Sequence, residues 1–244
     1  MKDLFSENSR LYHQARPSYP IAVIQEIMKY VPESHFAWDC GAGSGQFTQL
    51  LAPYFDCVAA TDLSADQLEH APYFTNVSYQ VQSAEKTTFS ARSINLITVA
   101  QAIHWFDFKE FYKEVSRTLK KDGVLAVVGY GLIQVQDQII NNLIHNLYFN
   151  ILNGYWDPER SYIDKQYKTI PFPFEEIIVP DFKMQYQWSS AQLLNYIQTW
   201  SALKCYQQKN QSNPLQELET YLKLQNSHIM VEFPVLLRLG RLAK

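Results

Sequence analysis

Short apolar runs alternate with amphipathic stretches through the first half of the chain. The run at residues 94–100 is nearly continuous, as expected for a strand buried on both faces. Strands that alternate with amphipathic helices are typical of parallel sheets with crossover helices. The pattern therefore predicts an α/β fold on a mostly parallel sheet. Its strands are expected at residues 36–38, 57–61, 77–81, 94–100 and 124–128.

Helix signals separate the apolar runs. Ser64 begins a capping box, with Gln67 three residues later, so a helix should start there. The helix after the fourth strand should stop at Asp122 and Gly123, with the glycine in the left-handed C-cap conformation. Apolar positions at helical spacing predict further helices over 21–28, 46–51 and 108–119.

The chain from residue 131 onward is less regular and rich in Gln, Asn and Tyr. Helical periodicity recurs near 135–150 and 190–208. Residues 177–188 and 229–239 read as an antiparallel pair that closes the sheet, although each contains a proline. No repeat or Gly/Ser-rich linker divides the chain. We expect one domain in three zones: a helical N-terminal cap over 1–30, a binding core over 31–135, and a substrate cap with closing strands over 136–244.

Composition and charge limit the possible partners. With 21 Lys and Arg against 24 Asp and Glu, the net charge of -3 leaves no basic field for a phosphate backbone, so nucleic acid is not expected. The three cysteines and six histidines lack disulfide or metal-ligand spacing. No stretch reaches the about 18 apolar residues of a membrane span. We expect a cytoplasmic protein without metal, as a monomer or homodimer.

A glycine-rich loop carries the main chemical signal. The first strand ends at Asp39, and Gly41, Gly43 and Gly45 follow before a helix. Such a loop presents backbone N–H groups and lets a ligand approach the main chain. Asp62 ends the second strand, where it can accept hydrogen bonds from ribose hydroxyls. Ligands of open α/β sheets bind at these strand ends, so the spacing predicts a nucleoside site.

Two ligand classes share this geometry. A dinucleotide fingerprint needs a third glycine where this chain has Gln46. Asp39 would repel a pyrophosphate and attract a cationic ligand such as a sulfonium with its ammonium group. No Tyr-x-x-x-Lys pair of short-chain dehydrogenases is present. These features favour S-adenosylmethionine. An NAD(P)-dependent oxidoreductase and a non-catalytic S-adenosylmethionine-binding protein remain as alternatives.

Residues 38–45 resemble motif I of the class I S-adenosylmethionine-dependent methyltransferases. Residues 62–64 and 83–85 are similar to that family's ribose and adenine segments. Residues 100–106, with 12–20 and 199–202, are similar to the trans-aconitate methyltransferase-like branch. The resemblance implies a Rossmann-like fold with a mostly parallel seven-stranded sheet and an antiparallel closing strand.

The resemblance also implies a set of cofactor-binding residues. Asp62 would hold the ribose, Leu63 would pack on the adenine, Ala84 would offer its N–H to a ring nitrogen, and Glu85 would accept from the exocyclic amine. The full set is Tyr12, Arg16, Asp39, Gly41, Ala42, Gly43, Gly45, Asp62, Leu63, Ala84, Glu85 and Gln101. Asp39 and the loop would cradle the methionine part, with Gln101 alongside.

Tyr12 and Arg16 are four residues apart on an expected helix, so both face the site, and Arg16 can pair with a carboxylate of cofactor or substrate. His104 is the candidate catalytic residue. Trp105, with Tyr19 and Trp200, is a candidate for substrate binding. The structural alternative makes His104 and Trp105 a buried pair at the sheet edge, and makes the other two aromatic residues part of the core.

The acceptor is expected to be a small molecule. The loop that amino-methylating DNA enzymes carry after the fourth strand is absent here, where residues 100–103 read Ala-Gln-Ala-Ile. The trans-aconitate-like resemblance implies carboxyl O-methylation of a small organic acid. A carboxylate is already ionised at neutral pH, whereas an alcohol or amine would need a general base such as His104.

Overall fold

The computed structural model describes residues 16–224 and 228–243. Its described strands form one sheet in the order β3-β2-β1-β4-β5-β9-β6, with β7 and β8 paired to β9. Neighbours among β1 to β5 are parallel, and β9 is antiparallel to β5. The strands are β1 Phe36–Cys40, β2 Cys57–Asp62, β3 Val77–Val81, β4 Ile94–Ala100, β5 Leu119–Tyr130, β6 Gln134–Val135, β7 Glu175–Ile177, β8 Phe182–Trp188 and β9 Ile229–Arg241. This confirms the predicted α/β fold with a mostly parallel sheet.

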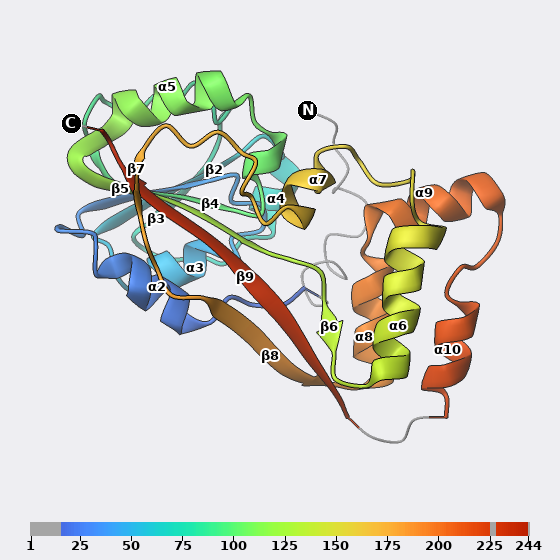
Figure 1. The fold of residues 1–244 in the computed structure, drawn as a ribbon. Coiled ribbons are helices and arrows are strands. Elements are labelled where there is room, and N and C mark those ends of the chain that lie inside the picture. Colours follow the sequence, from blue (N-terminus) through green and yellow to red (C-terminus); the bar gives the residue numbers. More distant parts are fainter. Residues whose placement is uncertain (1–15, 225–227, 244) are drawn as a thin grey trace.

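Helices cover both faces of the sheet, with α2 and α3 on one side and α5 on the other (Figure 1). The described helices are α2 Ile21–Met28, α3 Thr48–Leu51, α4 Ala65–Glu69, α5 Phe108–Thr118, α6 Gln138–Asn146, α7 Arg160–Asp164, α8 Ser190–Gln198, α9 Ser201–Asn210 and α10 Gln216–Leu222, with a 3-10 turn η1 Ile103–Trp105 and a π-helical turn η2 Leu147–Ile151. Alternation along β5 divides the core: Ala126 joins the α2 side, and Leu125 and Val127 join the α5 side.

The predicted closing pair is present: β9 is one continuous strand, and its partner is divided into β7 and β8. One edge of β9 pairs with β5, from Leu125 opposite Gly240 to Tyr130 opposite Val235. Its other edge pairs with β8 and β7. Pro180 falls in the break between β7 and β8. Pro234 lies inside β9, where its carbonyl oxygen still accepts a hydrogen bond from the Gly131 N–H at 2.9 Å.

The expected end of the helix after β4 is wrong. Helix α5 stops at Thr118, and β5 begins at Leu119 instead of at residue 124. Gly123 lies inside β5 and has no positive φ. Leu119 already pairs with Ile94 of β4, so strand pairing takes over the residues that helical periodicity assigned to the helix. A Cβ on Gly123 would lie 2.7 Å from the Leu119 side chain, which explains the glycine by packing.

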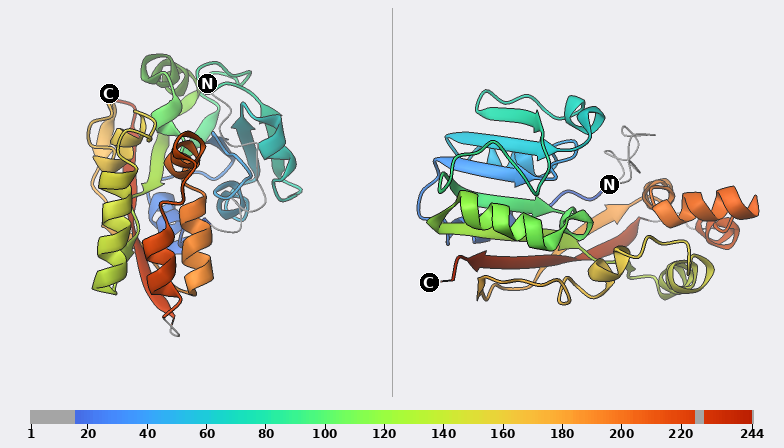
Figure 2. Two further views of the ribbon diagram at one scale, coloured as in Figure 1. Left: turned by 90° about the vertical axis from the view of Figure 1, so that its right-hand side faces the viewer. Right: turned by 90° about the horizontal axis from the view of Figure 1, so that it is seen from above.

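A lobe of helices α6, α8, α9 and α10 stands beyond the carboxyl ends of the parallel strands (Figures 1 and 2). The chain first enters the lobe after β6, returns to the sheet for β7 and β8, enters the lobe again with α8, and ends in β9. Its α8 begins with a full capping box formed by Ser189 and Gln192. The residues from 136 onward therefore form both the lobe and strands β7, β8 and β9 of the sheet.

Candidate active site

A cavity of about 360 Å³ opens at the carboxyl ends of β1, β2, β4 and β5. This is the edge at which ligands of open α/β sheets bind. Its lining residues come from the glycine-rich loop, the ends of five strands and the segment before α2. They are Arg16, Tyr19, Gly41, Ala42, Gly43, Ser44, Gln46, Phe47, Asp62, Leu63, Ser64, Gln67, Gln82, Ala84, Ala100, Gln101, Ala102, Trp105, Phe106 and Tyr130.

The glycine-rich loop turns sharply against the end of β4. Gly41 has φ +71°, and a Cβ there would lie 2.6 Å from the Ala102 Cβ. Gly43 has φ +54°, and its N–H donates to the Asp62 Oδ2 at 2.9 Å. Left-handed backbone and close approach together explain glycine at these positions. Gly45 does not line the cavity; a Cβ there would meet Pro72 at 3.0 Å.

Asp39 lies behind the loop and is not among the residues that line the cavity. The carboxyl is fully buried, and its two oxygens accept hydrogen bonds from the hydroxyls of Thr48 at 2.6 Å and Thr98 at 2.8 Å. Burial raises its pKa to about 6, against the lowering effect of the two hydroxyls. The side chain ties β1 to α3 and β4 beneath the loop.

Asp62 stands at the cavity wall, at the end of β2. Its Oδ1 accepts from the Ser64 N–H at 2.9 Å, and its Oδ2 from Gly43. Ser64 in turn caps α4, as predicted, by accepting from the Gln67 N–H. Each carboxylate oxygen retains a lone pair for a ligand. Leu63 follows with 46% of its surface exposed, so an apolar face is offered beside the carboxylate.

The predicted adenine turn is only partly at the cavity. Ala84 lines it, whereas Glu85 does not. One oxygen of Glu85 accepts from the Asp107 N–H at 3.1 Å, and the other is bonded to the Ser83 hydroxyl. Glu85 therefore holds the start of α5 near the β3 end. A direct contact of its carboxylate with the cofactor stays a prediction.

Tyrosine and arginine side chains line the part of the cavity next to the end of β5. Arg16 donates from Nη1 to the Tyr130 Oη at 2.9 Å. Tyr19 is buried, and its hydroxyl has no hydrogen-bond partner in the described part of the chain. Gln101 holds φ +54°, and its Oε1 accepts from the Tyr167 hydroxyl at 3.1 Å. Tyr12, predicted to face this site, lies outside the described residues.

His104 and Trp105 share η1, and their ring centroids are 4.9 Å apart. Trp105 lines the cavity, whereas His104 is 7% exposed and does not. The His104 Nδ1 has no hydrogen-bond partner among residues 16–224 and 228–243. Burial, followed by the charges of Arg160 and Arg16, lowers the His104 pKa to about 3. The imidazole is thus neutral at physiological pH and a weak base.

Trp200 is not among the residues that line the cavity. It is 3% exposed and packs in a ring cluster with Tyr148, Trp156 and Tyr196. This packing is what the structural alternative stated above expects. The position in the sequence could not separate the two, because the lobe brings its rings together from segments far apart in the chain.

Several lining residues escaped the sequence reasoning. Gln82 follows β3, and Tyr130 ends β5. The signal was available, because carboxyl ends of neighbouring parallel strands meet at one edge of the sheet. We used this rule for β1, β2 and β4. The same rule, used for β3 and β5, points to Gln82 and Tyr130.

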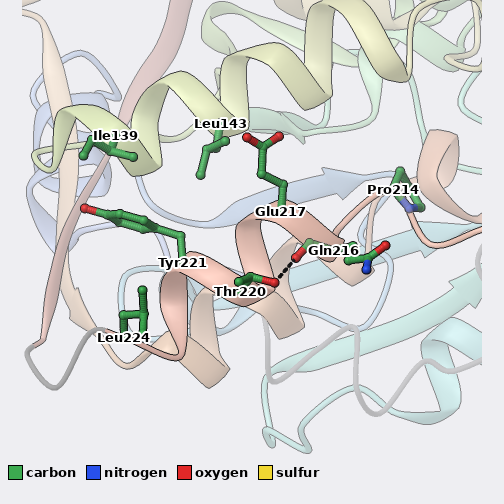
Figure 3. Close-up of a pocket in the computed structure, with 8 residues that line it drawn as sticks. All are labelled: Ile139, Leu143, Pro214, Gln216, Glu217, Thr220, Tyr221 and Leu224. Carbon is green, nitrogen blue, oxygen red and sulfur yellow. Dashed lines mark hydrogen bonds between the residues drawn. The ribbon is translucent and has the colours of Figure 1, made fainter.

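A second pocket lies on the outside of the lobe, between α6 and α10 (Figure 3). It is lined mainly by apolar groups, including Ile139, Leu143 and Leu224, and the Thr220 hydroxyl is turned to its own helix, donating to the Gln216 carbonyl at 2.7 Å. It offers one carboxyl, Glu217, and no cluster of reactive groups. The cavity at the strand ends is therefore the candidate active site.

Residues 16–224 and 228–243 contain neither a group of metal ligands nor a membrane-spanning helix. No group of His, Cys, Asp and Glu side chains there is arranged to hold a metal ion. No helix in this part of the chain combines the length and the apolar character needed to cross a membrane.

A Rossmann-like sheet with this loop, and with Asp62 at the carboxyl end of its second strand, is typical of enzymes that bind a nucleoside. Comparison with known proteins narrows the class. A family model described as a methyltransferase domain matches residues 38–127. A Dictyostelium discoideum protein, provisionally named as a methyltransferase, is 34% identical over 249 aligned positions, which cover 98% of this chain and 95% of that protein.

A solved structure from Anaeromyxobacter dehalogenans, provisionally described as a type II methyltransferase, is also 34% identical. It matches 94% of this chain and 99% of its own with a TM-score of 0.87. A Saccharomyces cerevisiae protein named as an S-adenosylmethionine-dependent methyltransferase is 30% identical over 47% of this chain and 43% of its own length. The chain belongs to the class I S-adenosylmethionine-dependent methyltransferases.

Proposed function

We propose that this methyltransferase transfers the methyl group of S-adenosylmethionine to a carboxylate oxygen of a small organic acid. The observation that carries the proposal is the buried His104, whose pKa is lowered to about 3, first by burial and then by the charges of Arg160 and Arg16. Such a site favours an acceptor that arrives with negative charge and needs no base. An alcohol or amine would have to lose a proton where the nearest imidazole is a poor acceptor.

The cavity fits the cofactor. Its glycine-rich loop has an open face at Gly43, where a Cβ would meet nothing closer than the Gln67 Oε1 at 3.7 Å. We assign the ribose hydroxyls to Asp62, the adenine to Leu63 and Ala84, and the methionine part to the loop over 41–43. When bound, S-adenosylmethionine supplies an electrophilic methyl group on a sulfonium. Asp39 supports the loop from behind, through Thr48 and Thr98.

The protein's own task in a methyl transfer is alignment and exclusion of water. We assign this task to the aromatic end of the cavity, formed by Tyr19, Trp105 and Tyr130. Arg16, held by Tyr130, supplies positive charge there. The Tyr19 hydroxyl and the His104 Nδ1 are buried polar atoms without partners in the described residues, and either can orient a carboxylate. Catalysis by His104 would then be through hydrogen bonding.

Charge and resemblance support a small organic acid as the acceptor. The net charge of -3 disfavours a nucleic acid. The resemblance of residues 100–106 to the trans-aconitate-like branch points to the same class of acids. A cytoplasmic monomer or homodimer remains our expectation for the protein that carries this activity.

Two measurements test the proposal in order. Calorimetric titration with S-adenosylmethionine, S-adenosylhomocysteine and NADPH should give micromolar binding of the two adenosyl ligands only. Labelled S-adenosylmethionine, supplied with small carboxylic acids and with alcohols and amines of similar size, should label acids alone, as base-labile esters. Labelling of an amine or alcohol with no acid ester would overturn carboxyl methylation, and binding of NADPH alone would overturn the cofactor assignment.

A further inference from the structure

Tyr167 is a buried residue with an unusual backbone conformation. It follows α7 and has φ +59°, and Gln166 before it has φ +56°. Residues other than glycine rarely adopt this left-handed conformation, and those with large side chains adopt it least readily. Such residues persist where surrounding contacts fix them, and they cluster at functional sites. Tyr167 is fully buried and does not line the cavity, so its contacts must show what it does.

Three strands hold Tyr167 in place. Arg238 of β9 donates from Nη1 to the carbonyl oxygens of Tyr167 and Ile170, both at 3.0 Å. The same guanidinium is fixed by Glu176 of β7, which accepts from Nε at 2.7 Å and from Nη2 at 3.0 Å. The ring lies over Gly129 of β5, where a Cβ would be 2.6 Å from a ring carbon. Gly129 has no positive φ, so this glycine is explained by the space that the Tyr167 ring occupies.

The Tyr167 hydroxyl reaches Gln101, which lines the cavity. The hydroxyl donates to the Gln101 Oε1 at 3.1 Å, and the Gln101 Nε2 donates to the Tyr130 carbonyl oxygen at 3.4 Å. A carbonyl oxygen can only accept, so the amide nitrogen faces Tyr130 and the amide oxygen faces the phenol. The second N–H group on Nε2 has no partner in the described part of the chain. Tyr167 therefore fixes the amide in an orientation that leaves one donor for a ligand.

The Gln101 amide lies toward β5, away from the strands that carry the cofactor-binding segments. The Gln101 backbone N–H donates to the Val128 carbonyl of β5 at 2.9 Å, and its side chain contacts Tyr130, the last residue of that strand. The glycine-rich loop follows β1 and Asp62 ends β2, whereas β4 separates β1 from β5 in the sheet. A nucleoside bound over β1 and β2 therefore leaves the Gln101 amide for the second substrate.

We propose that Gln101 binds the methyl acceptor and that Tyr167 is the residue that positions it. The inference rests on the proposed function. Gln101 Nε2 donates to one oxygen of the acceptor carboxylate, and the other oxygen is left to attack. That oxygen forms a bond to the methyl carbon as the bond from this carbon to sulfur breaks, with its electron pair left on sulfur. No proton moves, and the oxygen held by Gln101 becomes the carbonyl oxygen of the ester.

The hydrogen bond from Tyr167 makes Gln101 a donor toward the cavity. Without this bond the amide can turn over and present Oε1 to the acid, where two acceptor oxygens face each other and repel. The acid accepts from Gln101 both before and after the transfer, so the contact strengthens binding of the ground state and the transition state alike. Its loss should therefore raise KM and leave kcat nearly unchanged.

The test uses the full protein. Acetate, butanoate, benzoate, succinate and citrate are incubated with labelled S-adenosylmethionine, and the acid that yields the most ester becomes the probe. Gln101→Met keeps the length of the side chain and removes the donor. It should raise KM for this acid about tenfold or more, with kcat within about twofold. Calorimetry on the complex with S-adenosylhomocysteine should show the same fall in acid affinity, and the affinity for S-adenosylhomocysteine itself should not change.

A double-mutant cycle identifies the role of Tyr167. Tyr167→Phe alone should raise KM a few-fold, because the amide is no longer held. Added to Gln101→Met, it should raise KM no further, since no amide is left to position. Gln101→Glu replaces Gln101→Met if the latter does not fold; it keeps an acceptor for Tyr167 but sets a negative charge beside the acid, so acid binding should be lost.

Tyr112→Phe is the matched control. It removes another buried phenol, which donates to the Pro171 carbonyl at 2.5 Å and does not line the cavity. This variant should leave KM, kcat and the affinity for S-adenosylhomocysteine unchanged.

The outcomes separate the two proposals. Esterification by the wild-type protein with an unchanged KM in Gln101→Met would overturn the assignment of Gln101 and leave carboxyl methylation standing. A lower affinity of that variant for S-adenosylhomocysteine, with acid affinity unchanged, would also overturn it and place Gln101 at the cofactor. Additive losses in the cycle would show that Tyr167 only supports the fold. A wild-type protein that esterifies none of the acids would overturn the proposed function, and this inference with it.

Discussion

The two ends of the cavity are built by different means. The cofactor end consists of backbone and side chains that directly follow strands: the loop over 41–45, Asp62 with Leu63, and the turn over 82–84. The acceptor end combines Arg16 from before α2, Tyr130 from the end of β5, and the η1 turn. The charge of Arg160, from α7, acts on His104 of that turn. The first is specified by local sequence, and the second depends on packing between distant segments.

This difference indicates which changes each end tolerates. A binding site made of main-chain groups loses its ligand affinity when a substitution prevents the backbone from adopting the required conformation. A pocket made of side chains from separate elements loses binding one group at a time, while the fold persists. The same difference predicts that substitutions at the cofactor end have larger effects than those at the acceptor end.

Gly41→Ala should have the largest effect. A Cβ at this position combines left-handed backbone, which costs about 1–2 kcal/mol in an L-residue, with a 2.6 Å contact to the Ala102 Cβ. We expect S-adenosylmethionine affinity to fall by about 100-fold or more, or about 2.7 kcal/mol, measured by calorimetry. Gly154→Ala is the matched control, since Gly154 has φ +80° with nothing within 4 Å of a Cβ. Equal affinities in the two variants would contradict a main-chain cradle.

Asp62→Ala should weaken the cofactor by less. The loss of charge-assisted hydrogen bonds to ribose costs about 1.5–3 kcal/mol, and part of the fall comes from freeing the Gly43 and Ser64 N–H groups. Asp62→Asn keeps one acceptor oxygen and should give an intermediate affinity. Asp181→Ala, at an exposed acid, serves as the control. An unchanged dissociation constant with an intact circular dichroism spectrum would count against the assigned ribose contact.

His104 should make stability depend on pH in the acid range. Its pKa is about 3 when folded, against 6.5 as the reference, so below pH 6.5 the unfolded chain binds a proton that the folded protein refuses. Stability then falls by about 1.4 kcal/mol per pH unit as the pH drops toward 3, and no contribution arises above 6.5. Asp39, with its pKa raised to about 6, has the opposite slope between 3.8 and 6.

Urea denaturation of His104→Gln at several pH values measures the first of these slopes. Relative to the wild-type protein, the variant should gain stability as the pH falls from 6 to 4.5, because it lacks the imidazole whose protonation favours the unfolded chain. His70→Gln, at an exposed histidine, is the control. Parallel pH curves for wild type and His104→Gln would mean that His104 is not a buried neutral group.

Tyr167→Phe should have the smallest effect. It removes the hydroxyl that donates to the Gln101 Oε1 at 3.1 Å, a hydrogen bond worth about 1 kcal/mol. Gln101 keeps its own backbone hydrogen bond to the Val128 carbonyl. We expect a few-fold lower kcat/KM for the methylated acid, with cofactor affinity nearly unchanged. A loss as large as that of Asp62→Ala would place Gln101 at the cofactor end instead.

The sequence predicted the sheet well because its signals are local. The run at 94–100 is the observed β4, residue for residue, and Ser64 caps α4 as its capping box indicated. The prediction failed where tertiary contacts decide: strand pairing of Leu119 with Ile94 displaced the expected stop at Gly123. The sequence also did not show that Asp39 and Glu85 accept hydrogen bonds from neighbouring hydroxyls and N–H groups.

The acceptor end could not be predicted in the same way. Arg160 lies in a short helix without a motif, and only the structure shows that Tyr148 and Trp156 hold it beside η1. Trp200 packs in a ring cluster whose members come from segments far apart in the chain. Neither result is encoded in spacing along the chain.

The position of β9 also has a consequence for synthesis on the ribosome. This strand comes after all the others in the described chain, yet it joins β5 to β8 through both of its edges. A nascent chain that has emerged only as far as residue 224 exposes the edges of β5 and β8 without their partner, and exposed strand edges promote aggregation. The sheet can be completed only after translation passes residue 241, so chains that stall before that point are the natural targets of chaperones and proteases.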